Sequence, residues 1–241
     1  SGSGTDTCVE LAGGGTDTAQ TSRASFSRDA NVENLIYTGA TAFVGAGNEL
    51  ANLIIGGTAN DVLIGYAGDD ILVGNTGSEE MIGGTGNDTY QDAAPADSIV
   101  ELAGEGFDAV TTAATVYTLS SNVEVLTYTG GGVSFLGVGN ASDNIITGGT
   151  GRDEMFGRDG NDVLNNGGGG VGNEDTMLGG LGNDIYNITV LGTSTVEYAA
   201  EGTDEVRTTF SIYGLQSNVE NLTFTDNANH GAGVGNILDN V

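Results

Sequence analysis

Apolar and polar residues recur with a period of nine along two stretches of the chain. From Gly47 the blocks read GNELANLII, GGTANDVLI, GYAGDDILV, GNTGSEEMI and GGTGNDTYQ. From Gly139 they read GNASDNIIT, GGTGRDEMF and GRDGNDVLN and, after the four-residue insertion Asn166–Gly169, GVGNEDTML and GGLGNDIYN. One inward side chain between outward ones predicts a very short β-strand in each block. The eighth position supplies that side chain: Ile54, Leu63, Leu72, Met81, Tyr90, Ile146, Met155, Leu164, Met177 and Tyr186.

The sixth position of the blocks carries an oxygen-bearing side chain. Its residues are Asn52, Asp61, Asp70, Glu79 and Asp88 in the first array and Asn144, Asp153, Asp162, Asp175 and Asp184 in the second. Glycines precede them and permit the positive φ angles of a tight loop, in which backbone groups converge on an ion. The candidate loop glycines are Gly57, Gly68, Gly84, Gly86, Gly149, Gly151, Gly160, Gly180 and Gly182.

A period of nine fits neither a helix nor a run of hairpins. Two blocks per coil, about 18 residues, place equivalent loops above one another at a spacing of about 4.8 Å. This arrangement predicts an all-β parallel solenoid with stacked sixth-position residues, provided that the insertion bulges out as a surface loop. The predicted columns are Asn52, Asp70 and Asp88; Asp61 and Glu79; Asn144, Asp162 and Asp184; and Asp153 and Asp175.

A longer repeat of roughly 91–96 residues surrounds the arrays. VELAGGGTDT, VELAGEGFDA and VEYAAEGTDE begin at Val9, Val100 and Val196. We therefore expect a partial unit over 1–46, a first array over 47–91, strand-rich coils over 92–138, a second array over 139–187, and a third strand-rich segment that starts a further array over 188–241. The segments between arrays predict larger coils, and their acids, Glu10, Asp17, Glu101, Asp108, Glu197 and Asp204, either bind further calcium or cap turns.

The composition narrows the source of order in this chain. Gly supplies 43 of 241 residues and only 38% are hydrophobic, so each block buries little apolar surface for the conformational entropy it loses. Cys8 is the only cysteine, which excludes an internal disulfide. The net charge of -28 excludes nucleic acid and anionic membrane surfaces as partners. No apolar run approaches 18 residues, so we expect no membrane insertion.

Stacked carboxylates repel one another unless a cation lies between them. Hard carboxylate and carbonyl oxygens in a flexible loop suit calcium better than magnesium. Transition metals prefer His or Cys, and each occurs once. We therefore predict that several calcium ions per chain tie the coils together, and that the coils do not hold without them.

The blocks GGTGNDTYQ, GGTGRDEMF and GGLGNDIYN, from Gly83, Gly148 and Gly179, closely resemble the GGxGxDxUx repeat of the RTX (repeats-in-toxin, hemolysin-type) calcium-binding family. The resemblance implies a right-handed parallel β-roll in which each calcium ion is held by the aspartates of two stacked loops and by carbonyls of the glycine turns. It also implies export in an unfolded state by a type I secretion system and folding in external calcium.

These observations predict an extracellular structural repeat protein, of the surface-layer, matrix-filament or adhesin type, in which the calcium-bound roll is the function. We expect no catalytic residues and no organic cofactor. The chain is expected either to be part of a longer repeat protein or to self-associate head to tail into a filament or layer. The alternative is the repeat region of a type I-secreted enzyme or toxin whose catalytic domain is not in this chain. A disordered acidic calcium buffer is a third hypothesis, and it predicts no cooperative folding.

Overall fold

The computed structural model describes residues 10–11, 13–27, 30–169, 172–225, 232–238 and 240. Every regular element in these residues is a β-strand, so the described chain is all-β and contains no helix. Consequently, no helix long and apolar enough to cross a membrane occurs within the same ranges. Cys8 lies outside the described residues.

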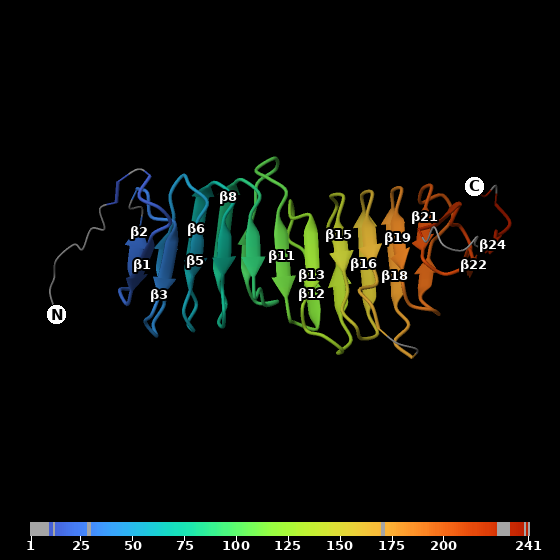
Figure 1. Ribbon diagram of the computed structural model, residues 1–241, viewed down its shortest axis with the longest axis horizontal. Helices are drawn as coiled ribbons and strands as arrows, with labels where there is room; N and C mark the ends of the chain where they lie inside the picture. Colours follow the sequence, from blue (N-terminus) through green and yellow to red (C-terminus); the bar gives the residue numbers. More distant parts are fainter. Residues whose placement is uncertain are drawn as a thin grey trace. The chain divides into compact units, whose positions relative to one another are not determined.

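The chain divides into two compact units, Ser1–Thr111 and Thr112–Val241. The strands of the first unit alternate along the chain between two parallel sheets (Figure 1). One sheet contains β1 (Thr18–Thr21), β3 (Asn34–Tyr37), β5 (Leu53–Ile55), β7 (Ile71–Val73), β9 (Thr89–Gln91) and β11 (Ala109–Thr112). The other contains β2 (Ser25–Ser27), β4 (Val44–Ala46), β6 (Val62–Ala67), β8 (Glu80–Thr85) and β10 (Ser98–Val100).

The second unit repeats this arrangement, which is therefore a parallel β-solenoid in both halves of the chain. Its first sheet contains β13 (Val125–Tyr128), β15 (Ile145–Thr147), β17 (Val163–Asn165), β19 (Ile185–Ile188), β21 (Glu205–Thr208) and β23 (Asn221–Phe224). Its second sheet contains β12 (Val116–Thr118), β14 (Leu136–Val138), β16 (Glu154–Asp159), β18 (Thr176–Leu181) and β20 (Ser194–Val196). A further pair consists of β22 (Ile212–Gly214) and β24 (Ala232–Val234).

The register of the strands confirms the two-block coil. Leu53 pairs with Ile71 and Ile71 with Thr89, and loops of successive coils in the arrays are 18 residues apart. The step widens to 22 residues across the insertion. Outside the arrays the steps range from 16 to 20 residues. The expected larger coils therefore occur, but the 16-residue steps are shorter than a two-block coil.

The core consists of the eighth-position side chains. All ten of them are fully buried, with 0% exposure, whereas most of their neighbours in the short strands are half-buried. Leu164, for example, lies between Ile146 and Tyr186 in adjacent coils. One large apolar residue per block is thus enough to fill the interior, because each coil stacks the same position directly over the last.

The insertion leaves the second array in register. Val163 pairs with Ile185 across it, as the stacking hypothesis requires. Gly167 and Gly169 are exposed, but Asn166 is buried at 1% exposure. Its amide donates to Thr193 Oγ1 at 3.3 Å and its Oδ1 accepts from Thr189 Oγ1 at 2.8 Å. The insertion is therefore a surface loop only in its glycines.

Candidate metal centre

Each stacked aspartate accepts, through one carboxylate oxygen, a hydrogen bond from a backbone N–H of the preceding coil. Asn52 N–H donates to Asp70 Oδ1 at 2.6 Å, and Asp70 N–H donates to Asp88 Oδ1 at 2.7 Å. The column continues beyond the array, because Asp88 N–H donates to Asp108 Oδ1 at 2.7 Å. These residues are 4% exposed or less. The structure thus brings together the predicted column and adds one acid from the next segment.

The second array repeats this geometry. Asn144 N–H donates to Asp162 Oδ1, and Asp162 N–H to Asp184 Oδ1, both at 2.7 Å. In the other column Asp153 N–H donates to Asp175 Oδ1 at 2.7 Å. The two stacked pairs that the 18-residue coil predicted are therefore in contact in spite of the insertion.

The column of Asp61 and Glu79 contains a third acid that the sequence analysis missed. Asp61 Oδ1 accepts from Phe43 N–H at 2.9 Å, and Glu79 N–H donates to Asp97 Oδ1 at 3.1 Å. Asp97 stands at the sixth position of residues 92–100, DAAPADSIV, whose eighth residue, Ile99, is buried. The signal was this Asp–Ile spacing, which the lack of glycines in the segment hid.

The second oxygen of most sixth-position acids points into a space that a cation can fill. Within the described chain, the following buried oxygens have no hydrogen-bond partner: Oδ2 of Asp70, Asp88, Asp162, Asp175 and Asp184 and both carboxylate oxygens of Glu79. A buried carboxylate oxygen without a partner costs free energy unless it pairs with a proton or a cation.

Glycines keep this space open. A Cβ on Gly65 would lie against Asp70 Oδ2 and 2.6 Å from the carbonyl oxygen of Gly83. A Cβ on Gly157 would lie against Asp162 Oδ2 and 2.6 Å from the carbonyl oxygen of Gly179. Carboxylate and carbonyl oxygens from two successive coils therefore face the same point. Such an all-oxygen set suits calcium, so the residues present fit the ion that the sequence predicts.

Burial and mutual repulsion raise the pKa values of several of these carboxyl groups in the metal-free protein to near neutral pH. Burial, together with the nearby Asp88 and Asp184 carboxylates, raises the pKa of Asp70 and of Asp162 to about 7, against the opposing effect of backbone hydrogen bonds. Burial and the neighbouring Asp97 and Asp61 raise the pKa of Glu79 to about 8. A bound cation would reverse this electrostatic penalty.

The loop glycines are of two kinds, because only some of them adopt the positive φ that glycine permits. Six take left-handed conformations with φ between +100° and +145°: Gly68, Gly84, Gly86, Gly160, Gly180 and Gly182. Gly57, Gly149 and Gly151 do not. Instead, Gly57 N–H donates to Asp61 Oδ2 at 2.6 Å, and Gly149 N–H donates to Asp153 Oδ2 at 2.7 Å. Both oxygens of Asp61 and of Asp153 thus accept backbone hydrogen bonds.

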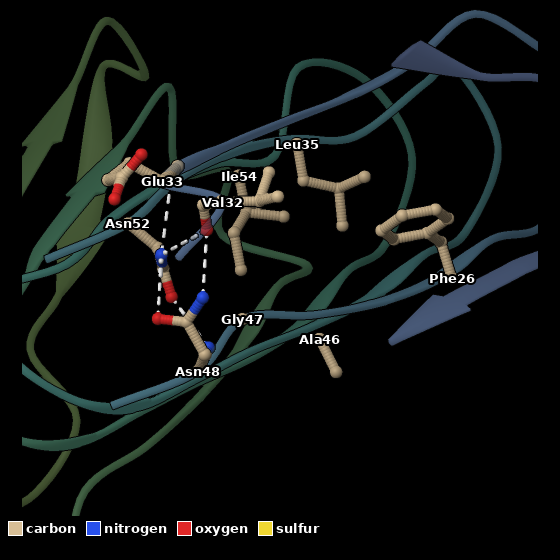
Figure 2. Close-up of a pocket in the computed structure, with 9 residues that line it drawn as sticks. All are labelled: Phe26, Val32, Glu33, Leu35, Ala46, Gly47, Asn48, Asn52 and Ile54. Atoms are coloured by element: carbon tan, nitrogen blue, oxygen red, sulfur yellow. Dashed lines mark hydrogen bonds between the residues drawn. The ribbon is translucent and has the colours of Figure 1, made fainter. Parts of the chain in front are cut away.

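The sixth residue of the first block in each array is an asparagine, and its amide forms hydrogen bonds, as Figure 2 shows for Asn52. Asn52 Nδ2 donates to the carbonyl oxygens of Val32 and Glu33 at 3.3 and 3.2 Å, and Asn52 Oδ1 accepts from Asn48 N–H at 2.7 Å. Asn144 makes the same bonds to Val123, Glu124 and Asn140. The amide nitrogens of Asn52 and Asn144 stand where the aspartates have an oxygen, so hydrogen bonds join the first loop of each array to the preceding coil. The Gly-Asn pair that begins each array, Gly47-Asn48 and Gly139-Asn140, was the available signal.

Comparison with known proteins gives an independent assignment of the arrays. Four segments match the model of the RTX calcium-binding nonapeptide repeat, over residues 46–78, 73–89, 138–171 and 170–186. The comparison with curated proteins found no match to the chain. The matched segments coincide with the two arrays in which the oxygens converge.

Proposed function

Because the two arrays of this chain are RTX calcium-binding nonapeptide repeats, we propose that the protein is an extracellular structural repeat protein whose β-roll folds and stacks on calcium. The chain is a calcium-binding repeat protein with a solenoid fold, and that fold is structural rather than catalytic. The proposal adds that the protein is extracellular and of the surface-layer, matrix-filament or adhesin type. It also adds that the calcium-bound roll itself performs the function.

One observation carries the proposal: in three of the four columns, an Asp uses one oxygen to hold the neighbouring coil and keeps the other buried without a partner, as in Asp70, Asp162 and Asp175. Such a chain is poorly suited to fold before it meets a divalent cation. Sites in extracellular modules bind calcium with dissociation constants of about 10⁻⁴–10⁻³ M, so they fill outside the cell and empty inside it.

We propose that ions lie between the stacked pairs of sixth-position acids. The pairs are Asp70 with Asp88, Asp61 with Glu79, Asp162 with Asp184, and Asp153 with Asp175. Calcium would supply the positive charge that offsets their repulsion and would bind the carboxylates together with glycine carbonyls. Asn52 and Asn144 bring no negative charge, and their loops would hold calcium more weakly.

Circular dichroism of the full chain during a calcium titration tests the folding claim. We expect a cooperative change from coil to β-structure near millimolar calcium, reversal by a chelator, and a much weaker response to magnesium at the same concentration. A spectrum that does not change with calcium would contradict the proposal and would favour a disordered acidic buffer.

RTX repeats are typical of type I-secreted proteins, which also supports a second candidate: the repeat region of a secreted enzyme or toxin. The gene sequence on both sides of this chain separates the two. Further array copies are expected for a structural protein, and a catalytic domain for the second candidate.

Self-association tests the structural role directly. A surface-layer or filament protein is expected to assemble head to tail once calcium has folded its coils. Sedimentation velocity with calcium and with chelator would then show larger species only in calcium. A strict monomer at high concentration in calcium would argue against a filament or layer.

A further inference from the structure

A group of three buried carboxylates follows each array, outside the segments that match the RTX repeat. After the second array the group is Asp184, Glu197 and Asp204, and after the first it is Asp88, Glu101 and Asp108. One carboxylate oxygen from each member lies within 4.8 Å of the others. Oxygens that bind one calcium ion at 2.3–2.6 Å can be up to about 5 Å apart.

The glutamate of each group occupies a position that holds glycine in the coils of the array, the first position of the coil. Gly139, Gly157 and Gly179 hold this position in successive coils of the second array, and Glu197 holds it next. The register agrees, because Leu178 pairs with Val196 immediately before Gly179 and Glu197. Where the array offers only backbone, the coil that follows it thus offers a carboxylate. Glu101 stands over Gly83 in the same way, since Ile82 pairs with Val100.

A tyrosine fixes the glutamate in this position. Tyr186 Oη accepts from Gly179 N–H at 2.7 Å and donates to Glu197 Oε1. Tyr90, Gly83 and Glu101 are connected identically. This explains why both arrays end in a block whose eighth residue is Tyr: its ring fills the core and its hydroxyl orients the glutamate.

In the second group, one carboxylate oxygen of Asp184 and one of Glu197 lack a hydrogen-bond partner among the described residues. Asp184 and Glu197 are 0% and 6% exposed, and Asp184 Oδ2 and Glu197 Oε2 have no hydrogen-bond partner in the part of the chain that the structure describes. A Cβ on Gly179 would lie against both Asp184 Oδ2 and the Tyr186 hydroxyl, which donates to Glu197. Asp204 uses Oδ1 to accept from Asp184 N–H at 2.8 Å. Three acids are therefore held together by backbone and tyrosine contacts, with buried oxygens left over.

From this geometry we infer that Asp184, Glu197 and Asp204 form a calcium site that closes the second array, and that Asp88, Glu101 and Asp108 form its counterpart after the first. This inference deepens the proposed function and rests on it. Three carboxylates give each closing site more negative charge than a stacked pair has, so it fills at lower calcium than the array sites. Tyr186 and Tyr90 are positioning residues.

Calcium stoichiometry of the full chain, measured by equilibrium dialysis against calcium chloride, tests the site. Glu197→Gln should lower the number of bound ions by one and remove part of the tightest binding, and Glu101→Gln with Glu197→Gln should lower it by two. Glu154→Gln is the matched control, since Glu154 is exposed on β16 in the same unit, and its count should equal that of the wild type.

Tyr186→Phe provides a second variant that keeps all three carboxylates. We expect an unchanged ion count with several-fold weaker binding in the tightest phase. Unchanged ion counts in both glutamine variants, with a normal calcium-induced β-transition, would overturn the closing sites and leave the proposed function standing. Absence of calcium binding by the wild-type chain would instead overturn the proposed function itself.

Discussion

At the scale of the residue, the two oxygens of one aspartate have different tasks. Asp162 Oδ1 accepts the N–H of Asn144 in the preceding coil, and Oδ2 is buried beside Gly157 without a partner. An asparagine at this position can still accept the N–H through its Oδ1, but it puts an uncharged amide group where the aspartate has its second, charged oxygen. The native residues Asn52 and Asn144 make a different pair of contacts, because their Oδ1 accepts an N–H within their own loop and their amide nitrogen donates to carbonyls of the preceding coil.

Asp162→Asn is therefore predicted to weaken calcium-induced folding while leaving the loop intact. One site at ten times its dissociation constant contributes about 1.4 kcal/mol, and this contribution should be lost. The calcium concentration at the midpoint of the β-transition should rise, as followed by circular dichroism.

Asp159→Asn is the control for Asp162→Asn, since it makes the same change of charge in the same loop at an exposed side chain. An equal rise in the midpoint for both variants would show that net charge, rather than the buried oxygen, controls the transition.

Two glycines allow the cost of the left-handed backbone conformation to be measured separately from the cost of a steric clash. Gly180 and Gly172 have φ of +103° and +101°, but a Cβ on Gly180 would collide with the carbonyl of Arg158, whereas one on Gly172 would meet nothing within 4 Å. We predict that Gly172→Ala costs about 1–2 kcal/mol, the usual cost of the left-handed conformation. Gly180→Ala should cost clearly more, as measured by urea unfolding in saturating calcium. Equal losses would mean that the coils can move apart at Gly180.

The stacked acids of the columns could be predicted from the sequence wherever the nonapeptide block was intact. The acids of the columns, such as Asp70 and Asp184, followed from position six alone, and the structure stacks them as expected. Asp97 could not be found in this way, because its block has no glycine. For Glu197 the sequence left calcium binding and turn capping open, and only its stacking on Gly179 places it with the carboxylates of Asp184 and Asp204.

At the scale of the element, the coil is a pair of three- to six-residue strands that cannot bury their apolar side alone. Each strand is stabilised by the strands above and below it, as in other solenoids. The period of nine predicted this register well, because a strict repeat leaves only one way to stack identical positions. The coils between arrays were less predictable, since their steps of 16 to 20 residues have no fixed period.

Leu164→Ala tests how much one coil depends on its single core side chain. Leu164 has no exposed surface and lies between Ile146 and Tyr186, so we predict a loss of about 2–5 kcal/mol in the free energy of unfolding in calcium. Urea unfolding would measure it. Val163→Ala, at the half-buried neighbour, should cost less, and a loss as large as that of Leu164→Ala would contradict a core built from the eighth position alone.

At the scale of the whole molecule, 33 acidic residues face 5 arginines. Many of these acids lie in buried columns, where their pKa values rise in the metal-free protein. The chain therefore has two ways to lower the electrostatic cost of folding, which are to bind protons or to bind calcium.

In chelator, the folded state is accordingly predicted to be most stable at acidic pH. Burial raises the pKa of Asp70 and Asp162 from 3.8 to about 7, so the folded state binds protons more tightly than the unfolded state. This contribution is fully present below about pH 4 and is lost as the pH rises through about 7. The content of β-structure at pH 5 and pH 8 in chelator, followed by circular dichroism, would measure the difference.

In calcium the trend should reverse below about pH 7, because protons compete with the ion for the same carboxylates. Metal-free protein that becomes more stable between pH 5 and pH 8 would contradict the assignment of these buried acids.

The 18-residue coil also determines how an array responds to tension. A chain pulled from both ends of an array would release one coil at a time, since each coil is held only by its neighbours. Each release would add about 60 Å of extended chain. Calcium ions lie between successive coils in our proposal, so the same ions that fold the array would set the force at which each step occurs. Such an array would yield in even increments and recover when the load is removed.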